Sequence, residues 1–380
     1  MSTDAFHVPL GRHVMSGFVH HARWLWRGLG NFETSLVRAQ VEQTPIVKPI
    51  FVSGLARSGT SVLIEIIASH PSVATHQYRD FPFLFIPYWW RQTLDRSAPA
   101  NVEASERAHG DRLMVTPNSP EAFEEVLWMA FFKGLHDPQQ RNALDAATSN
   151  PKFEAFYRDH IRKLLLISNR TRYAAKGNYN LTRMEYLLKL FPDARFVLPV
   201  RLPREQIASL IKQHKLFSEA AEKYPRSVKH LDRVGHFEFG KHRIWINPDG
   251  RNEVIESIDS LFKTGEEVRG WARYWANLYR WVAEQLKTND ALRAATLVVR
   301  YEEMCDQPER VLRGLLGHVE LADDSDERVN RWAPSLSRPT YYKPTFTEAE
   351  ERAIEEETSD VVAALGYDPQ PAGAGQRSIT

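Results

Sequence analysis

The chain has 380 residues, of which 43% are hydrophobic and 26% charged, a balance typical of globular proteins that bury a large core. Its 49 basic and 48 acidic residues give a net charge of +1, which excludes a global field that attracts nucleic acid, so any anion site must be local. The single cysteine, Cys305, excludes an intrachain disulfide and a metal cluster built on cysteines.

Residues 1–46 are expected to form an N-terminal helical extension, because bulky apolar residues alternate there with basic ones. Such a helix packs on its own domain or on a second subunit of a homodimer, or it makes peripheral contact with a membrane surface. No long apolar stretch opens the chain, so we expect a cytoplasmic protein. The most apolar window, residues 81–90, is half as long as a transmembrane helix, so no membrane span is expected there, and we interpret it as a buried or pocket-lining loop.

Short apolar runs alternate with helical patterns along the rest of the chain. The first run, Pro49–Ser53, predicts a buried parallel strand, which is followed by the turn GLARSGTS and a helix. Further strands are expected at 73–75, 172–176, 195–200 and 295–300. This alternation favours an α/β fold in three layers, with a central parallel sheet flanked by helices.

The predicted domain spans residues 47–368 and contains two insertions. Residues 91–170 form the first insertion and residues 216–265 the second, which includes a hairpin-like segment at 236–250. Residues 369–380 are rich in glycine, proline and polar residues, and we interpret them as a disordered tail.

The turn after the first predicted strand has the composition of a phosphate-binding loop. Its glycines expose backbone N–H groups at a helix N-terminus, and Arg57 adds a guanidinium group. The turn is not a Walker A motif, because Gly59 is followed by Thr60 where that motif has lysine. We find no aspartate placed to hold magnesium at the end of a later strand, so the sequence favours a metal-free reaction.

This loop resembles the 5′-phosphosulfate loop of the sulfotransferases that use 3′-phosphoadenosine 5′-phosphosulfate (PAPS), a family with a P-loop-like fold. The resemblance covers about residues 48–365 and is strongest to the bacterial branch related to the tyrosylprotein and carbohydrate sulfotransferases. It implies that the 5′-phosphate and sulfate of PAPS are held by Arg57, Ser58, Gly59, Thr60 and Ser61.

A second motif is similar to the 3′-phosphate element of the same family. Arg201-Leu-Pro-Arg204 follows a predicted strand, and Ser209 lies about two helical turns later. The resemblance implies that Arg201 and Ser209 bind the 3′-phosphate of PAPS. The family usually has an aspartate at the position of Leu202, so a residue that organises this turn is missing.

In-line transfer requires a cation at the leaving oxygen and a base for the proton of the acceptor. The resemblance assigns Lys176 to the leaving oxygen, although the proline that usually follows two residues later is absent. Asp80 is our first candidate for the base, provided that burial raises its pKa, and His76 is the second. His236 and Glu238 in the second insertion are further candidates.

The acceptor cannot be read from the sequence. The aromatic residues of the two insertions suit a small molecule, a glycan or a lipid headgroup, presented as a hydroxyl or an amine. Two alternatives to a sulfotransferase stay open: a P-loop kinase or other nucleotide phosphotransferase, and a non-catalytic nucleotide-binding relative.

Overall fold

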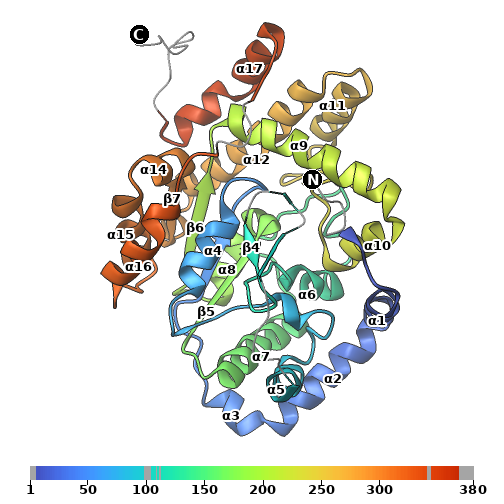
Figure 1. The fold of residues 1–380 in the computed structure, drawn as a ribbon, viewed down its shortest axis with the longest axis vertical. Coiled ribbons are helices and arrows are strands. Elements are labelled where there is room, and N and C mark those ends of the chain that lie inside the picture. The colour runs from blue at the N-terminus through green and yellow to red at the C-terminus, as the bar shows by residue number, and fades with distance from the viewer. Residues whose placement is uncertain (1–5, 98–103, 108, 111–112, 340–343, 368–380) are drawn as a thin grey trace.

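The computed structural model describes residues 6–97, 104–107, 109–110, 113–339 and 344–367. Its centre is a parallel sheet whose strands pair edge to edge (Figure 1). In spatial order the strands are β2 (Val73–Ala74), β5 (Arg172–Gly177), β1 (Ile50–Ser53), β6 (Arg195–Val200) and β7 (Thr296–Arg300). The predicted α/β fold is therefore confirmed, whereas the predicted tail at 369–380 lies outside the described residues.

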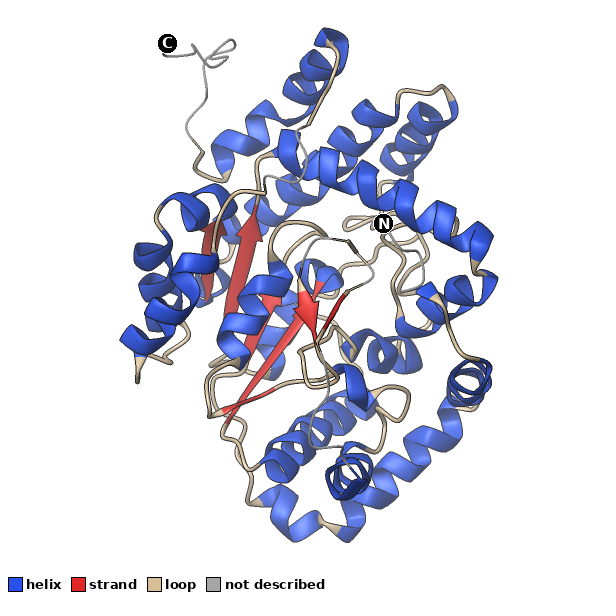
Figure 2. Ribbon diagram, in the orientation of Figure 1, coloured by secondary structure: helices blue, strands red, loops and turns tan. Residues whose placement is uncertain are grey.

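Alternate side chains of the central strands enter two separate hydrophobic cores, one on each face of the sheet. In β1, Ile50 and Val52 point into one core and Phe51 into the other. The first core is completed by α4 (Thr60–Ala68), α14 (Tyr301–Asp306), α15 (Pro308–His318) and α16 (Ser325–Trp332). The second contains residues of α6 (Glu124–Phe131), α7 (Pro151–Ser168), α8 (Met184–Leu190), α9 (Pro203–Lys223), α12 (Glu267–Thr288) and α17 (Glu348–Ala364). Helices thus cover both faces, as Figure 2 shows.

The remaining elements lie around this three-layer body. Residues 10–42 are helical, with α2 and α3 along α7 and α1 against α10 (Figure 1). Among the described residues, no helix combines the length and apolarity that crossing a membrane requires. The other helices and strands are α1 (Leu10–His21), α2 (Arg23–Leu36), α3 (Arg38–Glu42), α5 (Pro87–Ser97), α10 (Pro225–Val234), α11 (Asn252–Lys263), α13 (Asp290–Ala295), β3 (Ser105–Glu106), β4 (Met114–Val115) and the 3₁₀ turns η2 (Tyr78–Asp80), η3 (Asn178–Thr182) and η4 (Ala333–Ser335).

Two local predictions were wrong. Residues 236–250 form no strands, although the backbone N–H of Ile244 donates to the backbone oxygen of Phe237 at 2.8 Å, and side chains also hold this segment. The guanidinium of Arg243 lies 3.9 Å from the ring centre of Trp245, and Asn247 Nδ2 donates to the backbone oxygen of Pro138 at 3.0 Å. The apolar window 81–90 is not all loop, because α5 begins at Pro87, a residue type that suits a first helical turn.

The strand order places β1 between the two halves of the sheet. The chain leaves β1 toward β2 on one side and later returns to β6 and β7 on the other. In open parallel sheets, ligands bind at the carboxyl ends of the strands where the winding reverses. The loop after β1 therefore stands at the position where a ligand site is expected.

Candidate functional site

The loop that links β1 to α4 is fixed by backbone geometry that few residue types adopt. Gly59 has a φ of 110° and Arg57 a φ of 71°, both in the left-handed region. A Cβ atom on Gly59 would lie 3.0 Å from the ring of Tyr301, and one on Gly54 would lie 3.0 Å from the backbone oxygen of Pro199. This tight turn leaves the N–H groups of the first turn of α4, from Thr60 onward, without partners inside the helix, so they are available to an anion.

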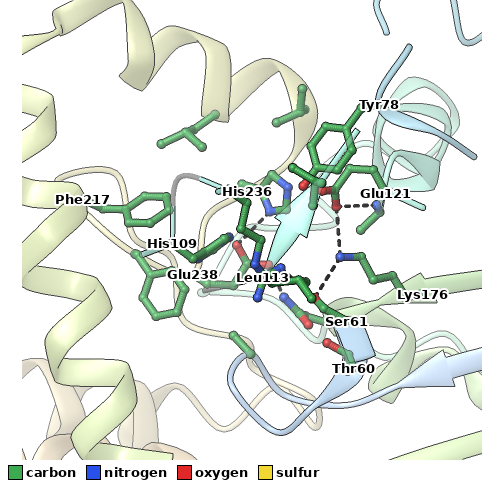
Figure 3. Close-up of a pocket in the computed structure, with 18 of the residues that line it drawn as sticks. Thr60, Ser61, Tyr78, His109, Leu113, Glu121, Lys176, Phe217, His236 and Glu238 are labelled. Atoms are coloured by element: carbon green, nitrogen blue, oxygen red, sulfur yellow. Dashed lines mark hydrogen bonds and ion pairs between the residues drawn. The ribbon is translucent and has the colours of Figure 1, made fainter. Parts of the chain in front are cut away.

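These residues form one wall of a cavity of about 560 Å³. Ser61 Oγ accepts a hydrogen bond from Lys176 Nζ at 3.1 Å and another from Arg107 Nη1 at 2.8 Å (Figure 3). Lys176 lies near the end of β5 and pairs with Val52 of β1. Because the loop begins where β1 ends, this pairing places the amine of Lys176 beside the loop. The cations concentrated here suit an anionic ligand.

The two predicted anion sites open into the same cavity. Both Arg57 and Arg201 line it, and Arg57 Nε donates to Ser209 Oγ at 3.0 Å. Arg201 Nη1 donates to the backbone oxygen of Arg57 at 3.4 Å, and its guanidinium lies 4.7 Å from the ring centre of Tyr301. Ser58, by contrast, is fully buried and is not part of the cavity wall. The structure thus joins the two sequence motifs directly.

The turn after β6 keeps its shape without the missing aspartate. The backbone N–H of Leu202 donates to Glu302 Oε1 at 3.0 Å, and the hydroxyl of Tyr367 donates to Glu302 Oε2 at 2.8 Å. Glu302 belongs to the segment after β7, which the sequence places about a hundred residues away. A carboxylate from another part of the chain therefore organises this turn.

Asp80 and His76 do not reach the cavity. Both side chains are buried, and Asp80 accepts hydrogen bonds from Arg91 Nη2 at 2.6 Å and from Arg91 Nε at 2.9 Å. Burial acts to raise the pKa of Asp80, but the charge of Arg91 holds this pKa well below its usual range, so the condition under which Asp80 could act as the base is not met. His76 Nε2 lies 3.0 Å from His160 Nε2 in the core. Both candidates have structural partners here.

Asp80→Asn is expected to lower the free energy of unfolding by about 3–5 kcal/mol, because it leaves the guanidinium of Arg91 buried without its anion. The catalytic rate per folded molecule and its pH dependence should stay unchanged, since Asp80 is not among the residues that line the cavity. Urea unfolding measures the free energy, and assays of the transfer reaction that the sequence predicts measure the rate. The matched control is Asp95→Asn, which breaks an exposed ion pair with Arg79 and should cost less than about 1 kcal/mol. A slow but fully stable Asp80→Asn variant contradicts this assignment.

The cavity contains a buried carboxylate that sequence reasoning missed. Glu121 Oε1 lies 3.2 Å from Lys176 Nζ and accepts a hydrogen bond from the backbone N–H of Ala122 at 2.6 Å. Burial acts to raise the pKa of Glu121, but the charge of Lys176 keeps it far below its usual range, so Glu121 is an anion that neutralises and orients the lysine. A single glutamate in a loop belongs to no motif, so the sequence alone does not indicate that it pairs with Lys176.

His236 and Glu238 line the same cavity as Lys176 (Figure 3). His236 Nδ1 lies 3.4 Å from Glu238 Oε2, while Glu238 Oε1 accepts a hydrogen bond from Asn178 Nδ2 at 2.8 Å. Burial alone lowers the pKa of His236, but the bond to Glu238 and the charges of Glu238 and Glu121 raise it overall. The pair is a histidine oriented by a carboxylate, the arrangement that acid–base chemistry requires.

Hydrophobic residues are also part of the cavity wall, beside polar ones such as Ser227 and His230 of α10. Helix α10 supplies Leu231 and Val234 to its wall, and aromatic residues complete it. They are Phe6, Phe81, Phe123, Phe217 and Phe239. Figure 3 shows Phe217 apart from Ser61 and Lys176, with His236 between them, so we call the part lined by phenylalanines the apolar end of the cavity.

Comparison with known proteins gives a consistent result. The sequence model described as the sulfotransferase family matches residues 49–245, which is more than half of the chain. The chain is 24% identical over 390 aligned positions to the omega-hydroxy-beta-dihydromenaquinone-9 sulfotransferase Stf3 of Mycobacterium bovis, covering 93% of this chain and 88% of the relative. Similar solved structures include sulfotransferase STF1 from Mycobacterium tuberculosis H37Rv, with 15% identity, a TM-score of 0.47, and 93% and 89% of the two chains covered. Sulfotransferase STF9 from Mycobacterium avium aligns with 15% identity and a TM-score of 0.49, over 88% and 82% of the chains.

Proposed function

This chain belongs to the sulfotransferase family, and from that membership we propose that it transfers the sulfuryl group of PAPS to the hydroxyl of a lipid-like acceptor. The proposal includes a metal-independent reaction, a cytoplasmic location, and a single transferase domain at 47–368 behind the extension 1–46. The observation that carries the proposal is the shared cavity, in which Arg57 and Arg201 stand side by side and Arg57 binds Ser209.

The donor fits this arrangement of cations. The loop residues Arg57, Thr60 and Ser61 would hold the 5′-phosphosulfate at the N-terminus of α4. Arg201 would hold the 3′-phosphate, with Ser209 fixing the guanidinium of Arg57 between the two groups. Lys176, kept charged and oriented by Glu121, would neutralise the oxygen that leaves with the nucleotide. PAPS itself supplies the activated sulfuryl group.

His236 is the base that the geometry favours. It lines the cavity between the loop and the apolar end, where an acceptor hydroxyl must stand to reach the sulfur. The carboxylate of Glu238 orients the ring through Nδ1 and stabilises the imidazolium that forms when Nε2 takes the proton. Asn178 in turn donates a hydrogen bond to Glu238, which fixes the carboxylate that orients His236.

The acceptor class follows from the apolar end of the cavity together with the relative. The name of the mycobacterial relative states a hydroxylated menaquinone derivative as its substrate, which is a lipid. In this chain the phenylalanine-rich end suits a hydrocarbon group, and an alcohol at the end of that group would meet His236.

The first test measures thermal stabilisation of the protein by nucleotides. Adenosine 3′,5′-bisphosphate, the product left by PAPS, should raise the melting temperature in the presence of EDTA, whereas ATP with or without magnesium should not. The Arg201→Met variant should bind the bisphosphate and 5′-AMP almost equally, because the residue expected to contact the 3′-phosphate is gone.

Arg204→Met is the matched control for that test. Arg204 belongs to the same short motif, but its Nε donates to Glu351 at 2.8 Å, outside the cavity wall. This variant should keep the preference for the bisphosphate. Stabilisation by ATP with magnesium, or an unchanged preference in Arg201→Met, refutes the proposed function.

A further inference from the structure

Exposed hydrophobic side chains are concentrated on one face of the N-terminal helices. Nine large hydrophobic side chains are exposed in the described residues, and seven of them lie between Leu10 and Leu36. They are Leu10, Val14, Met15, Phe18, Trp24, Phe32 and Leu36. Spacings of three, four and eight residues align most of them along the outer side of α1 and α2, and we call these seven residues the outer stripe. Trp24 is 70% exposed and Phe18 51%, a large area to leave in water.

The inner sides of the same helices are locked onto the body of the protein. Gly17 of α1 lies so close to Arg233 that a Cβ atom would stand 2.9 Å from its guanidinium, and Arg233 Nη1 donates to the backbone oxygen of His13 at 2.6 Å. Helix α2 is held through Glu33, whose carboxylate lies 2.8 Å from Lys163 Nζ in the core. Because the inner faces are occupied, the outer stripe cannot turn inward.

Basic residues outnumber acidic ones in the helices that carry the stripe, with three arginines against one glutamate in residues 6–36. Glu33 is the sole carboxylate in residues 6–36, and it is buried in its ion pair. Arg12 at the start of α1 is exposed, and so are Arg226 and Lys229 on the neighbouring helix α10, where the carboxylate of Asp232 is paired with His242. An apolar stripe flanked by cations is the pattern of a helix that lies on an anionic membrane surface.

The stripe adjoins the apolar end of the cavity. The segment that enters α1 contributes Phe6, Val8 and Arg12 to the cavity wall, and α10 contributes Leu231 and Val234. Figure 1 shows α1 beside α10 at the edge of the molecule. The start of α1, which carries part of the stripe, and its neighbour α10 thus also line the cavity.

We propose that the outer face of α1 and α2 docks on an anionic lipid bilayer, so that a lipid acceptor passes from the membrane into the cavity between the entry to α1 and α10. Docking follows from the stripe and its charges alone, whereas the passage of the acceptor rests on the proposed function. A second copy of the chain fits this face less well, because a two-fold contact sets the cationic flanks of both copies near each other.

Flotation with vesicles tests the docking step. The full chain should bind vesicles made of equal parts of phosphatidylcholine and phosphatidylglycerol, and bind pure phosphatidylcholine more weakly. The triple variant Phe18→Ser, Trp24→Ser, Phe32→Ser should lower the partition constant by about tenfold or more. Should that variant fold poorly, Val14→Glu with Leu36→Glu places two carboxylates at exposed positions of the stripe and should abolish binding to the anionic vesicles.

The control is Val47→Ser, which removes an exposed hydrophobic side chain outside the stripe and should bind like the unaltered chain. Light scattering, which measures the oligomeric state, tests whether a second copy of the chain covers the stripe instead of a membrane. If the chain is a dimer that the triple variant converts to a monomer, with vesicle binding unchanged, a second copy covers the stripe and the proposal is overturned. Absence of vesicle binding by the unaltered chain overturns it as well.

Failure of this proposal is distinguishable from failure of the proposed function. The triple variant should keep its stabilisation by adenosine 3′,5′-bisphosphate and its transfer rate to a short, water-soluble alcohol. Its rate with a long-chain acceptor embedded in vesicles should fall along with binding. Vesicle binding without any response to the bisphosphate would leave the docking surface standing and remove the proposed reaction.

Discussion

His236→Gln is expected to lower kcat by about 10²–10⁴-fold, because it removes the residue that we propose as the base for the proton of the acceptor. Binding of adenosine 3′,5′-bisphosphate should be retained, since the nucleotide residues lie on the loop side of the cavity. The unaltered enzyme should gain activity as the pH rises through the raised pKa of His236, because only the neutral ring accepts a proton. Steady-state rates across pH, normalised to the folded fraction, check this result.

Glu238→Gln tests whether His236 acts as the base, because a merely structural histidine would not change the pH dependence of the rate. The negative charge of Glu238 is the main cause that raises the pKa of His236. Without it, the acid limb of the plot of rate against pH should move to lower pH. The matched control is Asp232→Asn, which alters an exposed pair with His242, 2.9 Å apart, and should leave the profile in place. An unshifted acid limb in Glu238→Gln would mean that another group is the base.

Lys176→Met is expected to lower kcat by about 10²–10³-fold, because it removes the cation that we propose for the oxygen that leaves with the nucleotide. The same substitution leaves Glu121 buried without its partner, so the variant should also be less stable. The double variant Lys176→Met, Glu121→Gln separates these effects, since it should regain stability but not rate. Single-turnover transfer and urea unfolding measure the two quantities.

Lys215→Met is the control for this lysine, because Lys215 is exposed on α9 and should lose neither stability nor rate when substituted. Recovery of a normal rate in the Lys176→Met, Glu121→Gln double variant would show that the lysine serves only to balance the charge of Glu121. The leaving oxygen would then need another cation, and Arg107, which also binds Ser61, is the next candidate to substitute.

The sheet could be predicted because its signal is local. Strands such as Arg195–Val200 are continuous apolar runs, and the glycine-rich turn after β1 is a pattern within eight residues. The partner of Asp80 could not be predicted, because Arg91 lies one helix further on and only the folded chain brings the two together. Glu121 was missed for the same reason: its meaning depends on Lys176, which belongs to a distant strand.

The residues that complete the nucleotide loop from behind come late in the chain. Tyr301 packs against Gly59 and under Arg201, and Glu302 fixes the turn at Leu202, yet both follow β7. The region that carries the family pattern ends at residue 245. A ribosome must therefore synthesise more than fifty further residues before the loop gains its final supports, so recognition of the donor is linked to folding of the carboxyl-terminal third.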